Sequence, residues 1–478
     1  MRFTYNREII QRMSKQLAWL LSVAVLVSIG LLMACGSSYN KSSDGLVVVT
    51  SQGSALLETF SFGLNSGSMT AVNNPPANTG TLTQCVLNGI PSAIVVDPAG
   101  AYAYTIINAS PSVCGSSSAT GIGVFKINSD GTLAANGTLT ADPNPVALVM
   151  NTTGKYLFVA EGLNSMPGLS PPPRGFSNAP CPGTTQQFGI CVYSISGGAL
   201  TPVPGAFTLA LPAGQGFQPP NFAAIAVTPM TLPPLLNGQQ IAACSSSSQG
   251  NNPPKSEFLY ASDTVNSVVW EFSVNTSTGA LGNPPNRSQV PYFPSPSAPQ
   301  TGLPLSVPAG IAVDACDRFV YVSNNLANNI SAYSICSGMP TQSSQYCPQA
   351  PNPSDGSLVA VSGSPFANAG NTTDPGPMVV DPFGNTLYVL NGSTQTFGQI
   401  SIFRIATISG SLTPGTPATA ATGQGPTSLA IRSDDSWLFV ANFASGTLSQ
   451  YSITPSSGAL NALPVTTTDN WPSGVAVK

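Results

Sequence analysis

Charged side chains are scarce in this sequence, and histidine is missing altogether. Only 7% of the 478 residues are charged, and the number of histidines is zero. The side chain that most often serves as a general base near neutral pH is therefore absent. No C-x-x-C pair occurs either, so the usual zinc ligands are lacking, and we expect neither a metal ion nor another cofactor.

The low charge also excludes some partners and fold classes. The 14 Lys and Arg residues are outnumbered by 18 Asp and Glu residues, so no basic patch is expected to follow a phosphate backbone, and nucleic acid is not an expected partner. A disordered chain would be poor in hydrophobic residues, whereas here they make up 42% and recur in short runs. With 46 Gly and 45 Pro, the composition indicates many short strands joined by turns.

The first residues form a separate segment. An apolar run, LAWLLSVAVLVSIGLLMA, follows four basic residues, which are Arg2, Arg7, Arg12 and Lys15. This arrangement is typical of a secretory signal. The run is also long enough for the alternative, an uncleaved transmembrane anchor.

The end of this run, LMAC at residues 32–35, resembles the lipobox of bacterial lipoproteins. The resemblance implies that residues 1–34 are a signal peptide, that the thiol of Cys35 is lipidated, and that residues 35–44 are a polar tether. Gly36 rather than Asp follows the cysteine, so the inner-membrane retention signal is missing. We therefore expect a monomeric protein held by a lipid anchor in the outer membrane, facing the periplasm or the cell surface.

Two phrases recur along the rest of the chain. One, as in PGPMVVDPFGNTLYVLN, reads as two strands joined by a type I turn. The other, as in YSITPSSGAL, is an aromatic-x-aliphatic strand, a turn and Gly-x-Leu, where a fourth strand begins. Four antiparallel strands per unit is the plan of a propeller blade.

The two ends of the repeat complete each other. The last unit, WPSGVAVK, stops after its first strand, while GLVVVTSQ near residue 45 matches a second strand. We therefore predict an all-β fold, a single seven-bladed β-propeller over residues 45–478, in which the C-terminal strand joins N-terminal strands and closes the ring. Closure protects strand edges from aggregation. A β-solenoid or two sandwiches would explain the strands but not the split unit.

These motifs resemble the lactonase-like seven-bladed β-propeller family, which includes bacterial 6-phosphogluconolactonases and fungal muconate-lactonising enzymes. The shared patterns are P-x-x-hydrophobic-x-x-D-P-x-G, Y-V-x-N and Y-x-I…G-x-L. The resemblance implies the propeller fold and offers lactone hydrolysis as an activity. The histidine associated with the muconate branch has no counterpart here.

A ring of polar residues is expected at one mouth of the central channel, where the second strands end. Its members are Ser51, Asn108, Glu161, Asp263, Asn324, Asn391 and Asn442. Glu161 and Asp263 are candidate acid and base groups, and Arg174, in the Pro-rich insertion 162–188, is the candidate cation for an oxyanion or phosphate. The alternative is that the ring residues only cap turns. The turns with Lys155, Arg318 and Arg432 belong to the opposite face.

Eight cysteines remain after Cys35, an even number that indicates disulfides in an exported protein. Sequence alone leaves the connectivity open. Their places on the blade map favour four pairs, which are Cys85–Cys114, Cys181–Cys191, Cys244–Cys316 and Cys336–Cys347.

Three classes of function remain open. The sparse cations and missing histidine favour a non-catalytic scaffold that binds an envelope protein, a glycan or another ligand. The alternatives are a 6-phosphogluconolactonase-like hydrolase of an extracytoplasmic sugar lactone, and a structural surface protein with no small ligand.

The lipid anchor is directly testable. We expect Cys35→Ala to abolish lipid attachment and leave the fold intact, because the lipobox acts only on processing. Mass spectrometry of the mature N-terminus measures this, with Ser37→Ala as the control that keeps its lipid. An unmodified Cys35, or an intact leader in the wild type, contradicts the prediction.

Overall fold

The structure is a computed structural model that describes residues 44–72, 89–115, 119–137, 140–142, 144–162, 189–203, 221–229, 257–282, 290–291, 307–336, 356–392 and 397–478. These residues are mostly strands. The helical elements among them are single turns, α2 (Pro111–Cys114) and η1 (Ala369–Asn371). No helix in this part of the chain is long and apolar enough to cross a membrane.

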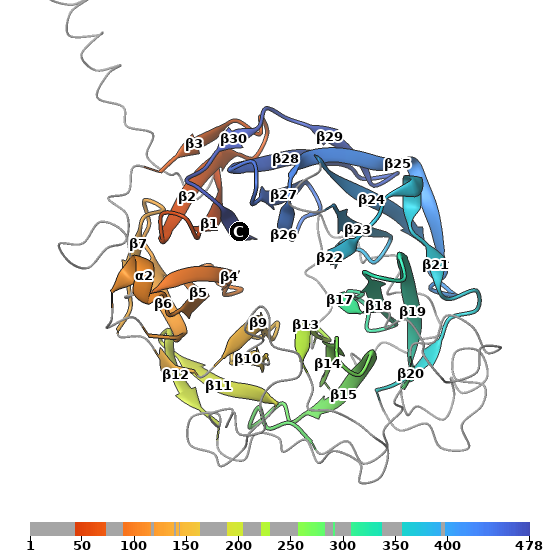
Figure 1. The fold of residues 1–478 in the computed structure, drawn as a ribbon, viewed down its shortest axis with the longest axis horizontal. Coiled ribbons are helices and arrows are strands. Elements are labelled where there is room, and N and C mark those ends of the chain that lie inside the picture. Colours follow the sequence, from red (N-terminus) through yellow and green to blue (C-terminus); the bar gives the residue numbers. More distant parts are fainter. Residues whose placement is uncertain are drawn as a thin grey trace, which may run out of the picture.

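The strands form seven antiparallel sheets arranged as blades around a central axis (Figure 1). Blades 1 to 6 follow the chain, and blade 7 combines both ends. The innermost strands are, from blade 1 to blade 7, β4 (Ile90–Val96), β9 (Pro145–Met150), β13 (Phe222–Val227), β17 (Pro308–Val313), β22 (Pro375–Val380), β26 (Pro426–Ile431) and β31 (Pro472–Val477). The second strands are, in the same order, β5 (Tyr102–Asn108), β10 (Tyr156–Glu161), β14 (Glu257–Asp263), β18 (Phe319–Asn324), β23 (Thr386–Asn391), β27 (Trp437–Asn442) and β1 (Asp44–Ser51).

The outer half of each blade is less regular. The third strands are β6 (Gly121–Ile127), β11 (Ile190–Ser196), β15 (Val268–Val274), β19 (Asn329–Cys336), β24 (Phe397–Ile405), β28 (Thr447–Thr454) and β2 (Leu56–Gly63). The outermost strands are β7 (Leu133–Ala135), β12 (Ala199–Pro202), β16 (Val290–Pro291), β20 (Ser357–Ala360), β25 (Leu412–Gln424), β29 (Ala459–Ala462) and β3 (Met69–Ala71), with the short β8 (Thr140–Ala141), β21 (Phe366–Ala367) and β30 (Thr466–Thr467) beside third strands. Blade 3 departs from the prediction, because its Gly-x-Leu contributes only a bridge between Leu281 and Val274.

The ring closes as the split repeat predicted. β31 pairs antiparallel with β1, from Val47 opposite Val477 to Ser51 opposite Pro472. Figure 1 shows the C-terminus at the inner rim beside β1. The seven innermost strands also contact one another in order around the channel, with β31 between β26 and β4. The predicted seven-bladed, all-β propeller with a shared blade is therefore confirmed.

The hydrophobic core lies between neighbouring blades. Successive side chains of a strand point to opposite faces of its sheet. In β10, Leu157 packs in one cluster with Tyr104 of blade 1, whereas Phe158 packs in another with Phe272 of blade 3. Every residue of β10 is buried as a result. Each second strand is therefore buried on both faces, which explains its nearly continuous apolar sequence.

The Gly-x-Leu repeat is explained by a contact between blades, which we call the glycine clasp. The hydroxyl of Tyr321 in blade 4 donates a hydrogen bond to the carbonyl oxygen of Gly410 in blade 5, at 3.1 Å. Gly410 has φ of +73°, and a Cβ there would overlap the ring of Phe319. Tyr260 and Tyr388 donate in the same way to the Gly-x-Leu glycines of the next blades, Gly356 and Gly458.

Four cysteines within the described residues are disulfide-bonded, namely Cys114, Cys191, Cys316 and Cys336. The cysteines that we predict as their partners, Cys85, Cys181, Cys244 and Cys347, lie outside the described residues. The pairing therefore stays a prediction.

The glycine clasp predicts the effect of adding a single methyl group. Gly410→Ala should destabilise the fold by about 1–3 kcal/mol from overpacking, on top of about 1 kcal/mol for a side chain at positive φ. Gly446→Ala is the matched control, because Gly446 has a similar φ of +63° and open space around its Cβ position. Urea unfolding of both variants separates the two costs. Equal losses of stability in the two variants would show that the clasp is not tightly packed.

Candidate functional site

The seven ring residues occupy one position of the repeat. Each ends a second strand, opposite the first residues of the innermost strand of its own blade. The pairs are Ser51–Pro472, Asn108–Ile90, Glu161–Pro145, Asp263–Phe222, Asn324–Pro308, Asn391–Pro375 and Asn442–Pro426. The innermost strands bulge next to this position, so the ladder is interrupted there and polar side chains supply hydrogen bonds instead.

The asparagines of the ring are used within their own blades. Three of them are buried and donate from the side-chain nitrogen to a serine of the third strand, at 2.9–3.0 Å: Asn324 to Ser331, Asn391 to Ser401 and Asn442 to Ser449. Asn108 is partly buried and donates instead to Ser92 Oγ of the innermost strand, at 3.1 Å. Their geometry is that of structural ties between strands.

Asp263 is similarly engaged. Its carboxylate accepts hydrogen bonds from the backbone nitrogens of Asn221, Val265 and Asn266, at 3.0–3.3 Å. It also accepts from the side-chain nitrogen of Asn266 at 2.6 Å and from the indole of Trp270 at 2.9 Å. The side chain is fully buried. Five donors leave little capacity for a substrate proton or a water.

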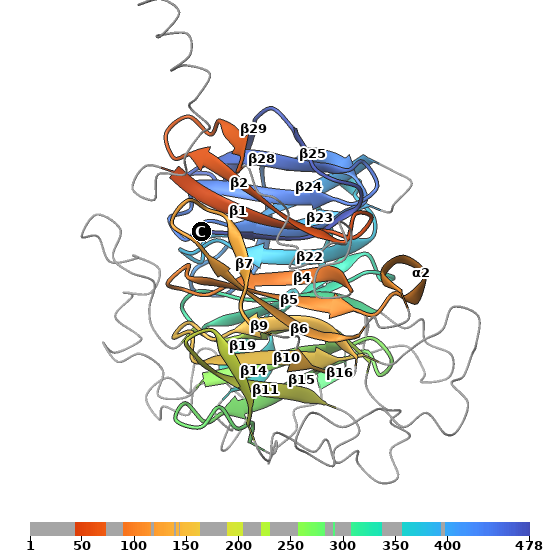
Figure 2. The ribbon, with the colours of Figure 1, turned by 90° about the vertical axis from the view of Figure 1, so that its left-hand side faces the viewer.

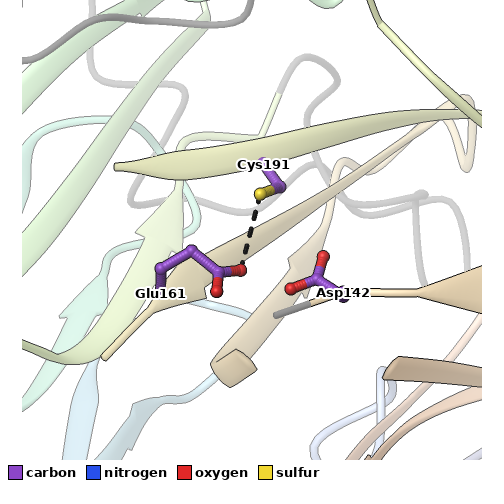
Figure 3. A group of neighbouring side chains, drawn as sticks. All are labelled: Asp142, Glu161 and Cys191. Carbon is purple, nitrogen blue, oxygen red and sulfur yellow. Dashed lines mark hydrogen bonds between the residues drawn. The ribbon is translucent and has the colours of Figure 1, made fainter. Parts of the chain in front are cut away.

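Glu161 has a different partner from the one that the sequence indicated. It lies against Asp142, which follows β8 in the crossing from blade 1 to blade 2, and both side chains are buried (Figure 3). The backbone nitrogen of Asn144 donates to Glu161 Oε2 at 2.9 Å, and the hydroxyl of Tyr193 donates to Asp142 Oδ2. Asp142 lies three residues before Pro145, the residue that pairs with Glu161. This short distance in sequence could have indicated that Asp142 lies near Glu161.

The two carboxyl groups share a proton at neutral pH. Burial, together with the neighbouring Asp142, raises the pKa of Glu161 to about 10. Burial also raises the pKa of Asp142, while hydrogen bonds from Glu161 and Tyr193 oppose that shift. A protonated Glu161 donates to Asp142, whose Oδ1 has no other hydrogen-bond partner. Both shifts therefore oppose a pair that carries two negative charges.

A metal ion is a poor match for this cluster. Cys191 Sγ lies 3.4 Å from Glu161 Oε1 (Figure 3), and these two side chains with Asp142 are close enough to ligate one ion. However, Cys191 is disulfide-bonded, and a metal ligand would have to be a thiolate. The residues fit a hydrogen-bonded carboxyl pair better than a metal centre.

The cations of the described residues do not join this cluster. Lys155, Arg318 and Arg432 lie in the turns between first and second strands, as expected. Arg318 forms an ion pair with Asp314 at 2.6 Å and donates to Thr407 O in the next blade at 2.8 Å. Arg174 lies outside the described residues, so its place relative to Glu161 stays a prediction.

Comparison with known proteins agrees with this architecture. Residues 362–475, which cover most of blades 5 and 6 and the closing strand, match the family described as lactonase, 7-bladed beta-propeller. The fold is that of the lactonase-like seven-bladed β-propellers. No curated protein matches the propeller in sequence.

Solved structures resemble the propeller over most of its length. A putative 6-phosphogluconolactonase from Bacteroides fragilis aligns with a TM-score of 0.56 and 17% identity, over 91% of this chain and 98% of that chain. The periplasmic gluconolactonase of Pseudomonas aeruginosa aligns with a TM-score of 0.53 and 17% identity, over the same shares. At such identities the likeness shows the fold and leaves the activity open.

The carboxyl pair predicts a pH dependence of stability. Unfolded Glu161 ionises near its ordinary pKa of 4.5, whereas the folded pKa is raised to about 10. The native state therefore binds more protons than the unfolded state between these pH values. The contribution of Glu161 to the free energy of unfolding is complete below pH 4.5 and is lost as the pH rises towards 10. Glu161→Gln, which keeps a donor to Asp142, should gain stability relative to the wild type across this range. Thermal unfolding at several pH values tests this, and a constant difference would contradict it.

Proposed function

We propose that this protein is a non-catalytic binding propeller, held at the outer membrane by a lipid on Cys35 and acting as a monomer. The observation that carries the proposal is the use of the ring side chains inside the fold. Asp263 accepts five hydrogen bonds within its own blade, and Asn324, Asn391 and Asn442 tie second strands to third strands. A hydrolytic centre needs polar groups that are free to act on water and substrate.

Protonation of Glu161 supports the same proposal. A general base must be ionised to take a proton from water, whereas the pKa of Glu161 is raised to about 10 by burial and by Asp142. No histidine is present to replace it. Among the described residues, the cation nearest in sequence to Glu161 is Lys155, in a turn at the opposite end of β10.

A second candidate function keeps some support. The solved relatives include proteins named as gluconolactonases, and a neutral Glu161 beside a charged Asp142 is a chemically reasonable general acid. Under this alternative, the propeller hydrolyses an extracytoplasmic sugar lactone, with Arg174 as the cation that stabilises the oxyanion.

The expected partner under the main proposal is an envelope protein or a glycan. Nucleic acid is not expected, because acidic residues outnumber basic ones. The face with the second-strand ends is the proposed binding surface. β10 ends there at Glu161, directly before the Pro-rich insertion in the sequence. Figure 2 shows α2, which follows β5, projecting from one side of the disc.

An activity assay separates the two functions. We expect the purified protein to leave gluconolactone and 6-phosphogluconolactone at their buffer hydrolysis rates, with Glu161→Gln, Asp263→Asn and Arg174→Ala unchanged from the wild type. Binding to an envelope glycan or protein should be lost when Gly162–Gln187 are deleted, and circular dichroism verifies the fold of the deletion variant. Clear turnover that any of the three substitutions abolishes would refute the non-catalytic proposal.

A further inference from the structure

Exposed large apolar side chains gather on one face of the propeller. Loops from second to third strands and crossings between blades share that face. Of the seven exposed large hydrophobic side chains among the described residues, six belong to such segments or to the adjoining strand ends, and these are Val113, Val146, Leu326, Phe397, Val465 and Trp471, whereas Ile408 lies in a turn on the other face. Trp471 and Phe397 are the aromatic members of these six.

Trp471 occupies a backbone position that favours glycine. It precedes Pro472, the first residue of β31, and has φ of +61°. The residues before the first prolines of three other innermost strands share this conformation, namely Val307 with φ of +48°, Asp374 with +58° and Gly425 with +59°. The turn into these strands therefore requires positive φ, which glycine adopts without strain and a bulky residue does not.

Burial of the Trp471 side chain in the core does not offset this backbone strain. It is 53% exposed, whereas Trp270 and Trp437 are 3% and 6% exposed. A strained backbone at an exposed aromatic residue is typical of a binding position, because there the side chain acts outside the fold.

The surroundings hold the indole in one orientation. The backbone nitrogen of Gln52 donates to Trp471 O at 2.9 Å. Phe443 of blade 6 stacks on the indole, with ring centres 5.9 Å apart and planes inclined by 18°. The two nearly parallel rings, one from blade 7 and one from blade 6, form a stacked apolar pair, which we call the aromatic platform, rather than the crossed rings of a cage for a cation.

The charges near the platform are acidic. Glu58 accepts hydrogen bonds from Ser51 Oγ at 2.6 Å and from the backbone nitrogen of Asp469 at 3.0 Å. Neither lysine nor arginine occurs in residues 51–58, 443–446 or 466–475. Anionic ligands, including acidic lipid head groups, would therefore be repelled. The side-chain amides of Gln52 and Asn470, which are neighbours of Ser51 and Trp471 in the sequence, can accept from and donate to the hydroxyl groups of a ligand.

We infer that the aromatic platform is a binding subsite for a neutral, unphosphorylated sugar ring of a glycan. The apolar C–H face of such a ring matches the negative face of the indole, and its hydroxyls match the uncharged amides around it. The inference rests on the proposed binding function and names its ligand class.

The test uses the full lipidated chain in detergent on an array of neutral and acidic oligosaccharides, followed by calorimetric titration of the best neutral oligosaccharide. Trp471→Gly should weaken binding at least about tenfold, the value of one aromatic stacking contact, while Trp471→Phe should keep most of the affinity. Val307→Gly is the matched control, because it makes the same backbone change in blade 4 and should leave binding unchanged. Melting curves confirm that each variant is folded.

Several results would overturn the inference. On the array, binding of no neutral glycan or a preference for acidic glycans would overturn it. In the titration, equal affinity of Trp471→Gly and the wild type would do the same. Binding of phosphatidylethanolamine–phosphatidylglycerol vesicles that requires Trp471 would point to a lipid surface instead. Lactone turnover with retained platform binding would instead refute only the non-catalytic function. Glycan binding that survives Trp471→Gly would refute only the platform.

Discussion

The packing of one blade on the next, fixed by the glycine clasp, is the constraint on which this structure depends. A left-handed glycine at the start of one outer strand lies on a side chain of the previous blade's second strand, as Gly410 lies on Phe319. A tyrosine two residues further on donates to the same glycine. The same tyrosine hydrogen bond joins blades 3 and 4, 4 and 5, and 5 and 6.

The same packing limits what the channel mouth can do. Because each second strand is buried on both faces, its polar last residue must satisfy its hydrogen bonds locally. Asp263 and the ring asparagines do so with their own blades. Glu161 accepts from the backbone nitrogen of Asn144 but also lies against another acid, and burial together with Asp142 raises its pKa so that it keeps a proton. Because the sequence has few charges, no Lys or Arg among the described residues forms an ion pair with Glu161 or Asp142.

The proposed binding function uses the outer parts of that face. Trp471 is exposed there, so under the proposal its side chain contacts a ligand rather than the core. Trp471 lies in blade 7, which combines β31 with β1 to β3 and borders Phe443 of blade 6. A scaffold of repeated structural ties with a few unrepeated surface side chains is consistent with binding rather than with hydrolysis.

The sequence by itself determined the architecture, because turn and strand phrases recur along most of the chain and each phrase reflects a local requirement. The Asp-Pro-x-Gly turn, the Gly-x-Leu start and the split last unit were sufficient to predict seven blades and their closure. Only the tertiary structure decided the chemistry of the acids. Asp142 and Glu161 are separated in sequence and become partners because blade 1 crosses to blade 2 at this face. Whether a carboxyl group is charged depends on burial and neighbours in space, and these follow from the packing of blades rather than from any local phrase.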